Sequence, residues 1–212
     1  MLYEPDVTLT DYALAVECLL FVWLLSRRES AKRALRAWFQ IFFSALAAAA
    51  LAGGTVHGFF AETTTFGSRS LWKAAIIAMG AAALGAWTVG LLMQFSAATA
   101  QSFAPLLAIA FAVYCVVVLW IRDDYVVAIV VYLPAALFLL GVFVAAYRRT
   151  RQPAALVGVL GILLTFAAAG VQQGRVALHP DYFDHNALYH AIQGAALFLL
   201  YRTASWSVEA GP

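Results

Sequence analysis

Two long uncharged runs meet at a short charged turn in the middle of the chain. The first is FAPLLAIAFAVYCVVVLWI, residues 103–121, and the second is YVVAIVVYLPAALFLLGVFVAAY, residues 125–147. Only Arg122, Asp123 and Asp124 separate them. Each run is close to the ~20 residues that a helix needs to cross ~30 Å of hydrocarbon, and neither alternates apolar with polar residues as a barrel strand does. This stretch predicts a hairpin of two transmembrane helices.

The composition of the whole chain agrees with this prediction. Of its 212 residues 64% are hydrophobic and 11% are charged, whereas a soluble domain carries about 25% charged residues. The mean hydropathy is +0.85. In lipid every backbone polar group must be satisfied within the protein, and helices do so segment by segment. No basic tract points to nucleic acid, and the lipids of the membrane are the expected partners.

Five further apolar segments flank the central hairpin, and polar or charged loops separate them. We therefore predict an all-α fold in which residues 1–212 form a single domain, a bundle of seven transmembrane helices. The predicted spans are 9–25, 38–60, 71–94, 103–121, 125–147, 153–172 and 185–201.

The basic residues predict the direction in which the chain crosses the membrane. If the seven spans alternate, nine of the 13 lysines and arginines fall on one side. Cytoplasmic loops carry an excess of basic residues. We therefore expect an inner-membrane, multi-pass protein with its N-terminus outside and its C-terminus in the cytoplasm. The nine are Arg27, Arg28, Lys32, Arg33, Arg36, Arg148, Arg149, Arg151 and Arg202.

All four histidines fall in the outer half of this arrangement. His57 lies near the outer end of the second span and His190 just inside the seventh, so their depths match. Two imidazoles at one depth can share a metal or a water, or each can bond a neighbouring helix. His185 lies about 140° around the helix from His190 and points to another face. Asp181 or Asp184 is expected to cap the seventh helix.

Polar residues continue into the outer half of the first and seventh spans. Glu17 lies in the middle of the first span, where a carboxylate is costly, so we expect either a structural hydrogen bond or a catalytic or proton-carrying role. Asn186, His190 and Gln193 form one polar stripe on the seventh span. The end of the sixth span is expected to line the same cavity with Gln172, Gln173 and Arg175.

Two short segments carry a resemblance to a known superfamily. Gly54-Thr55-Val56-His57 late in the second span, and Asp184-His185-Asn186-Ala187-Leu188-Tyr189-His190 at the start of the seventh, are similar to segments of the seven-helix alkaline ceramidases and progestin/adiponectin-type receptors (the CREST superfamily). Its members are lipid amide hydrolases or their relatives, and they hold zinc with one histidine in the second span and an HxxxH in the seventh. The resemblance implies that His57 and His190 are zinc ligands.

The chain also departs from the pattern of that superfamily. Asn186 stands at the first position of the HxxxH, Gly53 stands where the superfamily has a serine, and the third span holds no aspartate. The resemblance therefore implies a divergent bacterial relative, either metal-free or with a third zinc ligand from elsewhere. The residues that could supply this ligand are His185, Glu17 and Asp184.

Two functional hypotheses follow from these residues. The first is a membrane-embedded hydrolase of a lipid amide or ester, with a site near the periplasmic face in which His57 and His190 either hold a metal or act as general base. The second is a non-enzymatic membrane protein, either a receptor-like lipid sensor or a pathway for protons or small solutes. The scarcity of polar residues in the inner half of the fourth to sixth spans favours a one-sided cavity. The candidate site residues are Glu17, Asp184 and Asn186 for catalysis and His57, His185 and His190 for the metal.

Overall fold

The computed structural model describes residues 2–62, 64–179 and 182–209, and these residues form seven long helices and no strand. One of the seven is a composite, in which α4 and α5 lead into a π-helical turn, η1. The elements are α1 (Pro5–Ser26), α2 (Arg33–Phe59), α3 (Phe66–Gln94), α4 (Ala97–Ser102), α5 (Ala104–Val116), η1 (Val117–Ile121), α6 (Tyr125–Thr150), α7 (Pro153–Gln173) and α8 (His185–Glu209).

The all-α class and the number of long helices are confirmed, and each helix covers one predicted span. Six of the seven are long and apolar enough to cross a membrane: α1, α2, α3, the composite 97–121, α6 and α7. The seventh, α8, is not among these six. It contains the polar stripe described above and a serine- and threonine-containing C-terminal half, which lower its mean hydropathy.

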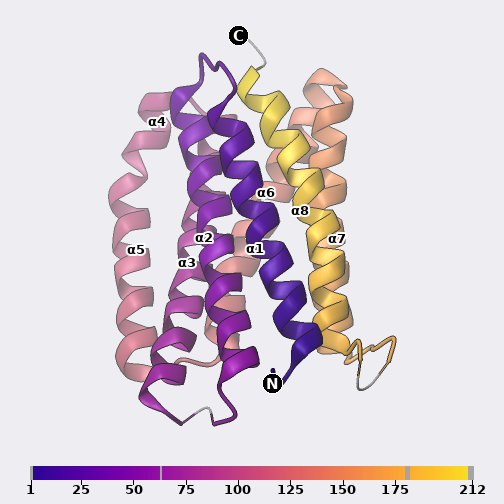
Figure 1. Cartoon of the computed structure of the whole chain (residues 1–212). Coiled ribbons are helices and arrows are strands. Elements are labelled where there is room, and N and C mark those ends of the chain that lie inside the picture. The colour runs from indigo at the N-terminus through magenta and orange to yellow at the C-terminus, as the bar shows by residue number, and fades with distance from the viewer. Residues whose placement is uncertain (1, 63, 180–181, 210–212) are drawn as a thin grey trace.

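Six helices close into a ring. In the order α1, α2, α3, α6, α7, α8, each helix packs on the next, and α8 packs back on α1. The composite helix 97–121 stays outside this ring and packs on α3, as Figure 1 shows for α5. The two chain ends lie at opposite ends of the bundle (Figure 1).

Glycines let α2 approach α1 closely. A Cβ atom at Gly54 would lie 2.8 Å from the Cβ of Asp11, and one at Gly58 would lie 2.8 Å from the Thr8 side chain. Small residues permit such close contact between membrane helices, where lipid supplies no hydrophobic drive to associate. The Gly53-Gly54 pair thereby fixes the position of Asp11 inside the bundle.

A buried tyrosine of the composite outer helix packs into the ring. Tyr114 lies against α3, and its hydroxyl donates to the carbonyl of Ile76 at 2.6 Å. A Cβ atom at Gly80 would lie only 2.1 Å from the Tyr114 ring. The ring therefore occupies the space that a side chain at position 80 would need.

We expect Gly80→Leu to displace Tyr114 and to loosen the outer helix. Overfilling a packed site costs about 1–3 kcal/mol, so thermal unfolding of the purified protein should begin at a lower temperature. Gly141→Leu is the matched control, because nothing lies within 4 Å of a Cβ at Gly141. Equal melting temperatures for the two variants would contradict this attachment.

Candidate functional site

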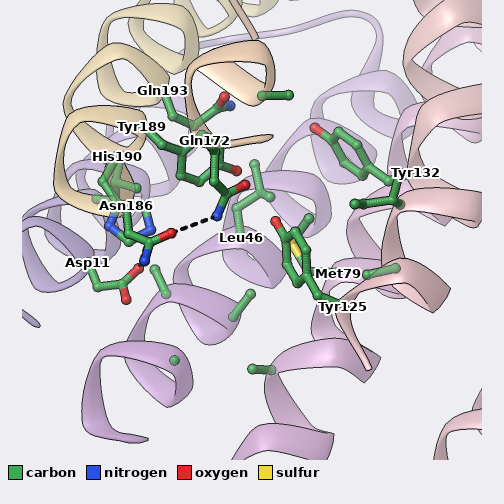
Figure 2. Close-up of a pocket in the computed structure, with 18 of the residues that line it drawn as sticks. Asp11, Leu46, Met79, Tyr125, Tyr132, Gln172, Asn186, Tyr189, His190 and Gln193 are labelled. Carbon is green, nitrogen blue, oxygen red and sulfur yellow. Dashed lines mark hydrogen bonds and ion pairs between the residues drawn. The ribbon is translucent and has the colours of Figure 1, made fainter. Parts of the chain in front are cut away.

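A cavity of about 640 Å³ lies inside the ring. All six ring helices line it, and the outer helix contributes no lining residue. The volume falls within the ~300–1,000 Å³ that is usual for small-molecule sites. Figure 2 shows residues from opposite walls, such as Tyr132 and His190, facing this space.

The lining is apolar for most of its area, and its polar groups gather near the ends of the helices at the N-terminal side of the bundle. None of the described lining residues is a lysine or an arginine. Three tyrosines, Tyr125, Tyr132 and Tyr189, also face the cavity, and the sequence analysis did not single them out. The other hydrogen-bonding residues of the lining are Asp11, His57, Trp72, Thr165, Gln172, Gln173, Asn186, His190 and Gln193.

The centre of this polar region is a contact between α1 and α8. His190 is 8% exposed and Asp11 is 6% exposed. The Nε2 atom of His190 lies 3.3 Å from Oδ1 of Asp11. On the other side of the imidazole, the Nδ1 atom of His190 lies 3.1 Å from the hydroxyl of Thr10. Both nitrogens of His190 therefore have partners on α1.

The hydrogen bonds of Thr10 assign the protons of this cluster. The Thr10 hydroxyl lies 2.8 Å from the carbonyl oxygen of Asp6 and 3.0 Å from that of Val7, to which it donates its only hydrogen. It must then accept from the Nδ1–H of His190. One proton remains between Nε2 and Asp11, and it can reside on either group. The pair has zero net charge in both arrangements, which makes its burial tolerable.

Further hydrogen bonds, made by Asp184 and Asp6, hold the start of α8 in place. Oδ1 of Asp184 accepts from the backbone N–H of Asn186 at 2.8 Å and of Ala187 at 2.9 Å. The predicted cap by Asp184 is confirmed, while Asp181 lies outside the described residues. The backbone N–H of Asp184 donates to the Asp6 carboxylate on α1 at 3.0 Å.

Asn186 and Gln172 join α8 to α7 at the mouth of the cavity. The Gln172 amide donates to Oδ1 of Asn186 at 3.1 Å (Figure 2). Asn186, His190 and Gln193 all line the cavity, so the predicted polar stripe on the seventh helix is confirmed. Gln172 and Gln173 line it as expected, whereas Arg175 does not.

The other two candidate metal ligands pair with acidic residues other than Asp11. His57 lines the cavity, pairs with the carboxylate of Glu4 and has its ring edge-on to Trp72. His185 lies outside the lining, and its Nδ1 is 3.6 Å from the Asp184 carboxylate.

These three histidines do not fit a three-ligand zinc site as they stand, because each pairs with a different acidic residue. Within residues 2–62, 64–179 and 182–209, no group of three or more His, Cys, Asp or Glu side chains could hold a metal ion. Zinc binding by this chain stays a prediction from the resemblance.

Glu17 also lies apart from the cavity. Its carboxylate is partly buried in the seam between α1 and α8, where Oε2 would be 3.1 Å from a Cβ atom at Gly194. The neighbouring residues Leu14 and Cys18 line the cavity instead. Of the two acidic residues in the first span, Asp11 is therefore the one that meets His190. The sequence analysis did not predict this contact.

We expect Asp11 and His190 to be strongly coupled in stability. Asp11→Ala or His190→Ala alone leaves a buried partner uncompensated and should cost about 3–5 kcal/mol. The double variant should cost less than the sum by about 1–3 kcal/mol. Reversible unfolding in mixed micelles measures both quantities.

The control is His57→Ala, because the Glu4 side chain that pairs with His57 is 53% exposed. An exposed pair contributes only about 0–1 kcal/mol. Additive effects of Asp11→Ala and His190→Ala would contradict the pairing.

Comparison with known proteins identifies one family. Its sequence model, described as a family of unknown function (DUF6962), matches residues 7–206. No curated protein and no solved structure matches the chain, so the resemblance to the ceramidase and receptor superfamily stays a prediction. The matched region includes all six ring helices nearly completely, and the chain belongs to the DUF6962 family.

Proposed function

We propose that this protein is a multi-pass protein of the cell inner membrane that binds a lipid-like amphiphile in its central cavity. The six apolar helices indicate a multi-pass membrane protein. Two further features of the chain support α8 as a seventh span and the predicted orientation, and the lining of the cavity supports the ligand class.

The inward orientation of its polar residues supports α8 as a seventh span. Asn186, His190 and Gln193 face the cavity, while Phe198 on the outer surface is 44% exposed. The uncharged polar side chains of the C-terminal half are buried against other helices. Lipid would therefore meet an apolar surface on α8, although the mean hydropathy of the helix is low. These buried residues are Thr203, Ser205 and Ser207.

The charge distribution supports the orientation. The loop between α1 and α2, which has five of the nine basic residues in or beside it, lies at the same end of the bundle as the C-terminus (Figure 1). Arg28 in this loop pairs with Glu209 near that terminus. By the positive-inside rule this end is cytoplasmic. The Asp11–His190 pair then lies in the outer half of the membrane.

The observation that carries the ligand class is an apolar cavity with its uncharged hydrogen-bonding groups at one end. An amphiphile satisfies both parts, because its chain fills the apolar region and its head meets Asp11, His190, Asn186 and Gln172. The lining offers no lysine or arginine to a phosphate. We therefore expect the bound molecule to have an uncharged head that carries hydroxyl or amide groups.

Filling part of the cavity should weaken binding. We expect Ala50→Phe, which places a ring in the lining, to weaken binding of tritiated lauroylethanolamide to the protein in nanodiscs by about tenfold, or about 1.4 kcal/mol. The control is Ala48→Phe on the exposed face of the same helix. The proposal fails if the unmodified protein does not bind the probe, or if both variants bind as it does.

The Asp11–His190 pair favours hydrolysis as a second candidate function. A carboxyl and an imidazole that share one proton can act together as general base and general acid. In this reaction water would attack the carbonyl carbon of an ester or amide, and Asp11 would accept a water proton on its second oxygen. The bond from the carbonyl carbon to the leaving oxygen or nitrogen would then break, and the proton would pass to that leaving atom.

Asp11→Asn separates hydrolysis from binding. The amide keeps the size of the carboxyl and can donate to Nε2 of His190, so the fold and the binding of lauroylethanolamide should persist. Release of lauric acid should fall by about 100-fold or more, as expected when a general base is lost. If the unmodified protein binds the probe but releases no lauric acid, the receptor-like function stands and hydrolysis does not.

A further inference from the structure

Gln193 has a buried polar group for which the fold provides no partner. It lies three residues beyond His190 on α8, about 4.5 Å further along the helix axis, and is 6% exposed. It belongs to the lining of the cavity, and Figure 2 shows its side chain extending from α8 above Tyr189. Gln193 therefore lies on the cavity wall, slightly deeper in the bundle than the polar end of the cavity.

The hydrogen bonds around Gln193 fix the orientation of its amide. The hydroxyl of Thr165 on α7 donates its hydrogen to the carbonyl of Gly161 at 3.1 Å. Thr165 can therefore only accept from Gln193, and the amide nitrogen Nε2 lies 3.4 Å from its oxygen. The amide oxygen Oε1 must face away from Thr165.

This oxygen is buried and has no hydrogen-bond partner among the described residues. Native proteins rarely leave a buried acceptor unpaired, because it has lost its water and gained nothing in return. Of the nearby lining residues, Phe166, Ala169 and Leu197 are apolar and have no side-chain donor, and the hydroxyl of Tyr189 is hydrogen-bonded to Tyr125. A molecule inside the cavity can supply the missing partner.

We propose that Gln193 is a ligand-contacting residue whose Oε1 accepts a hydrogen bond from an N–H or O–H of the bound amphiphile. This inference rests on the proposed function, since it requires an amphiphile in the cavity. It adds a second recognition point below the Asp11–His190 pair. The protein then selects amphiphiles that carry a donor between the head and the chain over those that carry only acceptors there.

Two probes that differ in one donor test this selection. Lauroylethanolamide has an N–H beside its carbonyl, and its ester counterpart, ethylene glycol monolaurate, has an oxygen at that position. We expect the unmodified protein in nanodiscs to bind the amide about threefold to tenfold more tightly, the range for one hydrogen bond. Gln193→Met removes the acceptor at similar length and should bring the two affinities within about twofold. Chromatography confirms that both probes stay intact during the measurement.

A second readout needs no ligand. Gln193→Met removes the unpaired acceptor together with the long bond from Nε2 to Thr165, and these two changes oppose each other, so the melting temperature of the empty protein should change little. A loss of stability well beyond the ~0.5–1.5 kcal/mol of that one bond would mean that Oε1 already has a partner, and it would overturn the inference. So would equal affinities of the unmodified protein for the two probes. If the unmodified protein binds neither probe, the proposed function itself fails, which is a distinguishable result.

Discussion

The seam between the first and the last helix is the constraint on which the rest of the structure depends. A helix as polar as α8 is stable in a membrane only if its polar groups find partners inside the protein. α1 supplies them through Thr10 and Asp11, which occupy both nitrogens of His190. Further along the seam Phe21 stacks on Tyr201 with ring centroids 4.5 Å apart. These contacts close six helices into a ring, and a closed ring can enclose a cavity.

The cavity follows from this closure and from the small residues that surround it. Three small residues of α2, Ala49, Ala50 and Gly53, and Ala75 of α3 line the cavity and leave space in it. Larger lining side chains come from α3, α6, α7 and α8, and they include Trp72, Tyr132, Phe166 and Tyr189. Because the polar residues cluster at one end, the cavity has the same amphipathic character as a lipid.

The helices and one face of the site could be predicted from sequence, because both depend on local periodicity. Spans follow from apolar length, and the stripe of Asn186, His190 and Gln193 follows from helical spacing. The partner of His190 could not be predicted, because Glu17 and Asp11 lie on the same helix and only the packing distinguishes them. Gly53 and Gly54 let α2 pack closely against Asp11, and this packing places the Asp11 carboxylate inside the bundle. For the same reason the sequence gives no hint that helix 97–121 lies outside the ring, since its apolar length suits either place.

The most direct test of this account is the distance between the Asp11 carboxylate and Nε2 of His190 in an experimental structure of the protein in lipid nanodiscs. The account predicts a distance near 3.3 Å, with Thr10 on the other ring nitrogen and an open cavity between α2 and α7. A His190 ring turned toward lipid, or a separation beyond the ~4 Å limit of an ion pair, would contradict it.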